Sequence, residues 1–171
     1  MKIFLGIVIA LLLLAGGAYL YASSLPEQTT HTRSITLQQS PATVFALLTD
    51  MENMPKWNRN MEKIEILPPI DGKQATRQYF KGNMQMTIIT SESTRPSHLV
   101  RTMGDNSGPF AGSWTYEIKP TNGGSDVVLT EDSHMKNPLF RLMAKIFGET
   151  KYLDEHLADM AKHFGEAATI R

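Results

Sequence analysis

The amino-terminal segment constrains this chain most, because residues 3–22 form a run of 20 residues without a charged side chain. As an α-helix this run measures about 30 Å, which matches the hydrocarbon thickness of a bilayer. Eleven of its residues are Leu, Ile, Val or Phe. Together they favour insertion by about 3 to 7 kcal/mol before the costs of Gly and Tyr are counted. The sequence therefore predicts one transmembrane anchor over residues 1–22.

The flanking charges leave two interpretations of this segment open. Lys2 precedes the apolar run, and the first charged residue after it is Glu27, so the positive-inside rule places the amino terminus in the cytoplasm. We expect a retained single-pass anchor in the cytoplasmic membrane, since the run exceeds a usual signal core and Tyr19 and Tyr21 suit the membrane interface. A cleaved secretory signal ending near residues 22–24 is the alternative. Both interpretations put the remaining chain on the outer, periplasmic or extracellular, side.

The composition of the 171-residue chain favours one compact domain behind the leader. Lys and Arg number 17, as do Asp and Glu, so the net charge is zero and nucleic acid is not an expected partner. The absence of cysteine excludes disulfides, thiolate nucleophiles, cysteine zinc sites and iron–sulfur clusters. We expect a polar linker over residues 23–32, which contains Pro26, and a domain over residues 33–171.

Short alternating segments in this domain predict an antiparallel sheet of about seven strands. The strands are expected at residues 33–38, 63–67, 74–80, 84–91, 98–103, 113–119 and 126–134. Turn signals separate them, and Asn122-Gly123-Gly124 is typical of a hairpin turn rather than of a phosphate-binding loop.

Serine or asparagine followed by proline marks two helix starts. Ser40-Pro41 predicts a short helix that runs to Asp50, and a second short helix or turn is expected over residues 51–58. Asn137-Pro138 predicts a long carboxy-terminal helix over residues 139–164, about 39 Å long if it is continuous. Gly148 is the expected interruption, because glycine disfavours a helix interior.

Five stretches resemble a known family: residues 35–50, Met54-Pro-Lys-Trp-Asn58, Gly112-Ser-Trp-Thr-Tyr-Glu-Ile-Lys-Pro120, residues 127–131 and residues 137–141. Over residues 33–166 the chain is similar to the SRPBCC superfamily of START and birch-allergen-like helix-grip domains, in particular its bacterial polyketide cyclase/dehydrase-like branch. It departs from the family at Arg59, where many relatives have a proline.

The resemblance implies an α+β helix-grip fold, in which a curved antiparallel sheet wraps around the long carboxy-terminal helix. It also implies a deep hydrophobic cavity between the two. Relatives hold lipids, hormones or polyketide-like molecules in this cavity, and a few of them cyclise or dehydrate aromatic polyketides. A hydrophobic or lipid-like small molecule is therefore the expected partner, and no cofactor is expected.

Flexible thioethers, aromatic rings and an inward-facing arginine are the side chains that suit such a cavity. The candidate ligand-binding residues are Trp57, Tyr79, Met84, Met86, Arg101, Met103, Trp114, Tyr116, Met143 and Met160. Met135 and Arg77 suit the cavity on the same grounds. Core packing explains the same methionines and rings, and surface exposure explains the same arginines.

The strongest acid–base candidates lie on the last predicted strand. Asp132 and His134 share one strand face and could exchange a proton, whereas Glu131 points to the opposite face. An exposed polar strand face explains the same three residues. On the last helix, His156, Asp159 and His163 lie in one region, where we expect surface pairing and no metal.

The function we expect is a membrane-anchored module that binds a hydrophobic or lipid-like molecule. A polyketide cyclase or dehydratase that uses acid–base residues in the cavity is the alternative. A third possibility is a partner-binding domain whose core is filled. Protein partners and oligomeric state stay open.

Overall fold

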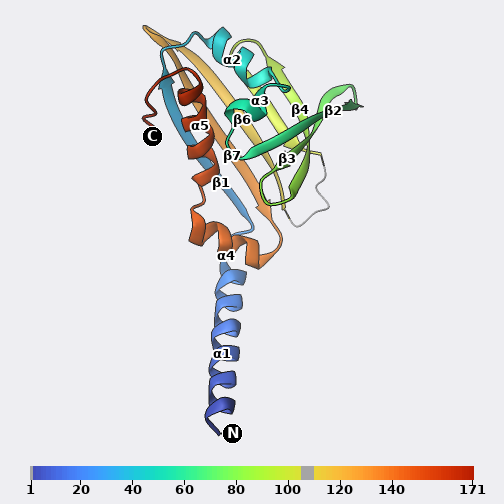
Figure 1. The fold of residues 1–171 in the computed structure, drawn as a ribbon, viewed down its shortest axis with the longest axis vertical. Coiled ribbons are helices and arrows are strands. Elements are labelled where there is room, and N and C mark those ends of the chain that lie inside the picture. The colour runs from blue at the N-terminus through green and yellow to red at the C-terminus, as the bar shows by residue number, and fades with distance from the viewer. Residues whose placement is uncertain (1, 105–109) are drawn as a thin grey trace.

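A computed structural model describes residues 2–104 and 110–171 as a seven-stranded sheet with helices on one face and one long projecting helix (Figure 1). The strands are β1 Gln28–Leu37, β2 Met61–Ile70, β3 Lys73–Phe80, β4 Met84–Thr94, β5 His98–Met103, β6 Phe110–Thr121 and β7 Gly124–Met135; the helices are α1 Lys2–Ser24, α2 Pro41–Thr49, α3 Met54–Trp57, α4 Pro138–Phe147 and α5 Lys151–His163. The strand order is β1-β7-β6-β5-β4-β3-β2, and every neighbouring pair is antiparallel. The predicted α+β helix-grip fold is confirmed.

Strand β1 begins earlier than the sequence pattern indicates. Residues 28–32, expected in a polar linker over residues 23–32, pair with residues 130–134 of β7. Their polar side chains find partners across the strands: Thr30 Oγ1 donates to Asp132 Oδ1 at 2.5 Å, and the hydroxyls of Thr32 and Thr130 lie 3.0 Å apart. Both faces of this strand end carry polar side chains, so residues 28–32 lack the apolar alternation that predicts a half-buried strand. Only residues 25–27 connect α1 to the sheet.

The hydrophobic core fills one half of the space between the sheet and α5. Leu153, Leu157 and Met160 on α5 are fully buried against the sheet. Helix α2 closes this end of the core with Val44 and Leu48, and it begins where Ser40 Oγ accepts a bond from the Thr43 backbone N–H at 3.2 Å. This half of the domain is tightly packed.

Helix α5 is too short to cover the other half of the sheet face. Strands β6 and β7 each have 12 residues and extend about 40 Å, whereas α5 has 13 residues and extends about 20 Å. The expected 39 Å helix is divided at Gly148, whose φ of +102° takes the chain out of helical conformation. Helix α4 therefore crosses the end of the sheet instead of continuing along it (Figure 1). Much of the curved face beyond α5 is left uncovered.

Helix α1 projects away from the domain and packs its carboxy-terminal end against α4 (Figure 1). Residues Ile3–Ser24 are long and apolar enough to cross a membrane, a property that membrane anchors and signal sequences share. Almost all of its side chains are exposed, but Ala22 is fully buried at the contact with the domain.

Gly124 marks the closest approach between the β6–β7 turn and the end of β1. A Cβ atom at Gly124 would lie 1.9 Å from the Leu37 carbonyl oxygen, whereas one at Gly123 would meet nothing within 4 Å. We expect Gly124→Ala to lower the free energy of unfolding by about 1 to 3 kcal/mol, the usual cost of overpacking. Gly123→Ala should change it by less than about 0.5 kcal/mol. Urea denaturation followed by circular dichroism measures both, and equal midpoints would contradict the close approach.

Candidate functional site

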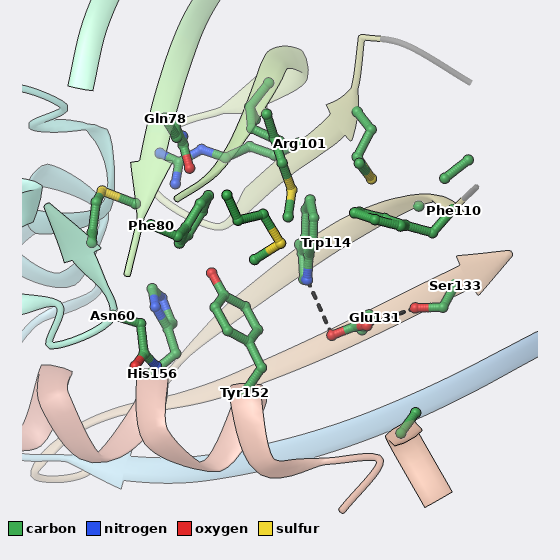
Figure 2. Close-up of a pocket in the computed structure, with 18 of the residues that line it drawn as sticks. Asn60, Gln78, Phe80, Arg101, Phe110, Trp114, Glu131, Ser133, Tyr152 and His156 are labelled. Carbon is green, nitrogen blue, oxygen red and sulfur yellow. Dashed lines mark hydrogen bonds between the residues drawn. The ribbon is translucent and has the colours of Figure 1, made fainter. Parts of the chain in front are cut away.

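A cavity of about 560 Å³ occupies the uncovered half of the curved face (Figure 2). Its volume lies within the range of small-molecule sites. The lining follows the two-residue period of the strands, since Gly112, Trp114 and Tyr116 on β6 face it in turn, as do Glu131 and Ser133 on β7. The cavity and the packed core are therefore successive parts of one sheet face.

Methionine dominates the cavity wall. Seven of the ten methionines of the chain line it, namely Met54, Met61, Met84, Met86, Met103, Met135 and Met143. Unbranched thioether side chains change rotamer at low cost and adapt to guests of different shape. The wall can therefore adapt to apolar ligands of different shape.

Arg101 places a positive charge inside this apolar space. It lies on β5 and is only 4% exposed. Its Nη2 donates a hydrogen bond to the Leu48 carbonyl, and the guanidinium carbon lies 5.9 Å from the centre of the Tyr116 ring. Its Nε has no hydrogen-bond partner in the part of the chain that the structure describes. Among the described residues, no ion pair involves Arg101. Burial lowers its pKa, yet a guanidinium stays protonated in proteins, so the cavity holds a buried cation that no described carboxylate pairs with directly.

Glu131 supplies a carboxylate at another part of the wall (Figure 2). Its Oε2 accepts from Trp114 Nε1 at 3.2 Å, and its Oε1 accepts from Ser133 Oγ at 2.6 Å. The two bonds hold the carboxylate along β7. The site thus combines an apolar wall, one buried cation and one oriented carboxylate.

His156 on α5 borders the cavity as a neutral imidazole. Because the Asn58 amide nitrogen can only donate, His156 Nδ1 accepts from it at 3.1 Å, and Nε2 therefore carries the proton and donates to the Tyr116 hydroxyl at 3.1 Å. Burial, helped by the charge of Arg101, lowers the pKa of His156 to about 4. Burial also raises the pKa values of Tyr116 and Tyr152, so both phenols stay protonated at neutral pH.

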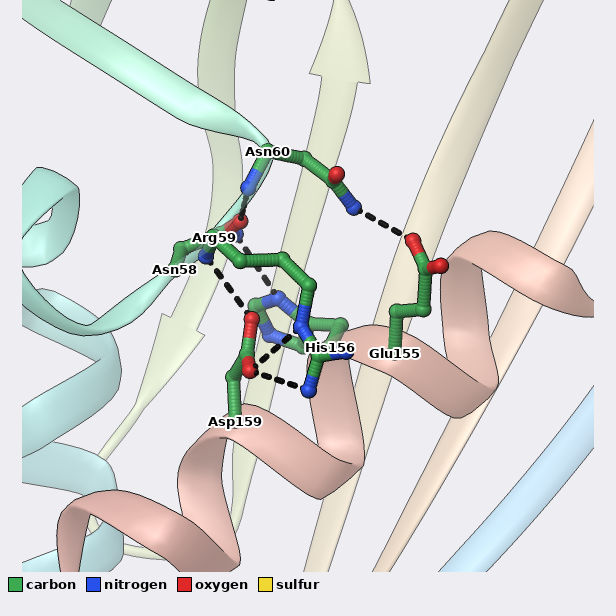
Figure 3. A network of polar contacts seen from close by, with 6 residues as sticks. All are labelled: Asn58, Arg59, Asn60, Glu155, His156 and Asp159. Carbon is green, nitrogen blue, oxygen red and sulfur yellow. Dashed lines mark hydrogen bonds and ion pairs between the residues drawn. The ribbon is translucent and has the colours of Figure 1, made fainter.

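A polar network fixes α5 to the segment between α3 and β2 (Figure 3). The buried Asp159 carboxylate accepts from the Arg59 backbone N–H at 2.8 Å and from Arg59 Nε at 2.7 Å. Asn60 Nδ2 donates to Glu155 Oε2 at 2.7 Å. Arg59, which replaces a proline that many relatives have, thus gains an ion pair with α5.

The expected surface pairing on the last helix is wrong for two of its three residues. His156 and Asp159 face the interior, where Asn58 and Arg59 satisfy them, and only His163 is exposed. Within residues 2–104 and 110–171, no group of three His, Asp or Glu side chains could hold a metal ion.

The structure brings most of the candidate ligand-binding residues together. Those that line the cavity are Met84, Met86, Arg101, Met103, Trp114, Tyr116 and Met143, together with the acid–base candidate Glu131. Those that do not line it are Trp57, Tyr79, Met160, Asp132 and His134.

Two physical reasons account for the residues outside the cavity. Tyr79, Asp132 and His134 point to the outer sheet face, where the Tyr79 hydroxyl donates to Glu65 at 2.8 Å and His134 lies 3.6 Å from the Glu27 carboxylate. Trp57 and Met160 belong to the packed half instead. The Trp57 ring packs against His156, with 5.2 Å between ring centres.

Several lining residues are not among the candidate ligand-binding residues: Asn60, Gln78, Phe80, Phe110, Tyr152 and His156 are examples. The alternation on β3 places Gln78 and Phe80 on one face, opposite Tyr79. That pattern was available in the sequence, but it does not say which face is covered by a helix. Tyr152 and His156 lie four residues apart on α5, and their rings stack with 6.0 Å between centres.

The curved antiparallel sheet, the carboxy-terminal helix and the apolar cavity between them define a helix-grip protein of the START/SRPBCC type, as the sequence resemblance implied. The chain belongs to the family described as polyketide cyclase/dehydrase and lipid transport, whose profile matches residues 28–165. No curated protein sequence matches it.

Solved structures share this fold at low sequence identity. The di-domain ARO/CYC BexL from the BE-7585A biosynthetic pathway superposes with a TM-score of 0.66 at 8% identity; the match covers 81% of this chain and 50% of BexL, so this chain spans half of that protein. The Zhui aromatase/cyclase from Streptomyces sp. R1128 gives 0.62 at 14% identity, over 80% of this chain and 92% of that one. A START superfamily protein from Mycobacterium smegmatis gives 0.57 at 15%, over 81% and 99%.

The buried neutral state of His156 predicts a pH dependence of stability. The folded state disfavours the protonated ring, so this contribution is complete above pH 6.5 and is lost as the pH falls toward 4. The loss amounts to about 3 kcal/mol at most. Urea denaturation between pH 7 and pH 4 should therefore show a smaller fall for His156→Gln than for the unaltered chain. The exposed control His163→Gln should keep the full fall, and an unchanged slope for His156→Gln would contradict the assignment.

Proposed function

We propose that this protein is a membrane-anchored module that binds one amphipathic small molecule with an acidic group. The apolar body of the ligand lies against the methionine wall, and its carboxylate or phosphate pairs with Arg101. The observation that carries this proposal is the buried Arg101 guanidinium, which no described carboxylate pairs with, in a mostly apolar cavity.

The energetics of a buried charge support this ligand class. A desolvated cation without a partner costs several kcal/mol, and a paired anion offsets much of that cost. A carboxylate or phosphate can accept two parallel bonds from a guanidinium. The Arg101 Nε hydrogen, which has no acceptor among the described residues, is one of the donors for such a pair. A purely apolar guest would fill the cavity but leave this donor unpaired.

The location we propose is the outer side of the cytoplasmic membrane, with α1 retained as anchor and its amino terminus inside. The short connection over residues 25–27 and the burial of Ala22 against the domain favour a helix that stays part of the folded protein. Anchoring raises the encounter frequency with molecules that partition into the membrane. A lipid-like ligand would be most concentrated there.

A charge-matched pair of probes tests the ligand class. We expect the unaltered chain in nanodiscs to bind cis-parinaric acid at least about tenfold more tightly than its neutral methyl ester, since a charge-assisted bond contributes about 1.5 to 3 kcal/mol. Arg101→Met should remove this preference while keeping the ester affinity. Arg77→Met, which removes an arginine from an exposed position on β3, is the matched control and should keep the preference. Equal affinity of acid and ester for the unaltered chain would contradict the proposal.

The position of Glu131 supports catalysis as a second candidate function. An oriented carboxylate in an apolar cavity can act as a base for the enolisation that cyclisation and dehydration require. Asp132 and His134 face away from this space and would take no part.

Ligand extraction separates the two functions. If the protein dehydrates its guest, mass spectrometry of molecules extracted from purified Glu131→Gln should detect a species one water heavier than that from the unaltered chain. Under binding alone, both preparations should carry the same molecule. Ser113→Ala, on the opposite face of β6 from Trp114, serves as the matched control and should leave the extracted mass unchanged.

A further inference from the structure

Helix α4 presents an apolar face that the rest of the domain does not cover. Leu139, Phe140, Met143, Ile146 and Phe147 are 37% to 67% exposed. Their spacing puts them on one side of the helix, as in helices that lie in a membrane interface. Such a face is costly in water and needs an apolar environment.

The junction with α1 fixes where this face lies. The buried Arg141 on α4 donates from Nη1 to the Leu25 carbonyl at 2.7 Å, and the same nitrogen lies 3.7 Å from the Glu27 carboxylate. The Met135 N–H donates to the Glu27 carbonyl at 2.8 Å. The connection between α1 and the sheet is therefore held against α4, which crosses directly above the end of α1 (Figure 1).

The same helix borders the mouth of the cavity. Phe140 and Met143 are exposed and also line the cavity, and so does Met84 on β4. The Phe140 ring contacts Phe110, another lining residue, edge to face with 5.9 Å between ring centres. Side chains that belong both to the cavity wall and to the outer surface mark an opening beside α4.

We infer that α4 lies in the bilayer interface, with its apolar face among the acyl chains, and that the cavity opens there toward the lipid. The inference rests on the proposed retention of α1 as anchor. The occupant of the α4 face is the bilayer because the face is continuous with the end of the membrane-spanning segment and α1 meets the domain at this helix. A ligand would then pass between membrane and cavity without crossing water.

Single cysteines in the cysteine-free chain test the depth of α4. Nitroxide labels go on Leu12→Cys within α1, Ile146→Cys on the α4 face and Lys119→Cys beside the β6–β7 hairpin at the far end of the domain (Figure 1). The full chains are reconstituted in vesicles of phosphatidylethanolamine and phosphatidylglycerol. We expect labels at 12 and 146 to collide more with oxygen than with a water-soluble nickel chelate, and the label at 119 to do the reverse.

Any other combination of oxygen and nickel accessibilities at the three labels contradicts a specific part of this model of α4 and α1. A label at 146 that behaves like the one at 119, while the label at 12 lies in the bilayer, refutes the inference alone. A label at 146 shielded from both reagents means that protein covers α4, and this also refutes it. A label at 12 in water refutes the anchor and the inference together, whereas the binding proposal stands or falls with the parinaric acid titration.

Ligand exchange tests the opening. Ile146→Ser/Phe147→Ser changes two residues that do not line the cavity, so equilibrium affinity for cis-parinaric acid should stay constant while its transfer from vesicles slows by about tenfold. Ile66→Ser/Ile70→Ser removes two exposed isoleucines from β2 and is the matched control, which should transfer at the unaltered rate. Equal transfer rates for both double variants would overturn the role of α4 as the entrance.

Discussion

The difference in length between the sheet and the helix that it grips determines the architecture of this domain. Strands β6 and β7 are about twice as long as α5. Where α5 runs along the sheet, Leu153 and Leu157 fill the interior. On the amino-terminal side of Gly148 the chain forms α4, which does not continue along the sheet, and an open space remains there. A continuous helix would have to fill that space with its own side chains. The cavity is therefore a consequence of the break at Gly148, which separates α4 from α5.

Polar groups in this apolar space determine which ligands and reactions it suits. Arg101 contributes a charge that no described carboxylate pairs with, Glu131 is held by Trp114 and Ser133, and His156 is kept neutral by burial. The first of these suits an acidic ligand, while the second suits proton transfer. The ion pair between Arg59 and Asp159 and the hydrogen bond between Asn58 and His156 hold α5 against the segment between α3 and β2. The cavity therefore combines an adaptable wall with rigidly supported polar positions.

The sequence allowed the strands, the capped helices and the break at Gly148 to be predicted, since each depends on local periodicity or on a single backbone preference. It placed five of six singled-out methionines at the cavity, because alternation groups them, but Met160 packs in the core. Tyr79 and Trp57 could not be placed, since periodicity does not reveal which face is covered or where the core ends. The buried state of Arg101, and the strand formed by residues 28–32, depend on partners about 50 to 100 residues away in the chain.

The central claim is that an acidic amphiphile occupies the methionine-walled space. Carbon-13 labelling of methionine methyl groups tests it most directly, with the full chain in nanodiscs and a fatty acid as titrant. We predict that resonances of the lining residues Met86 and Met103 shift, while those of the core residues Met51 and Met160 stay in place. Unchanged resonances throughout the titration, or equal shifts for core and lining methionines, would contradict the account.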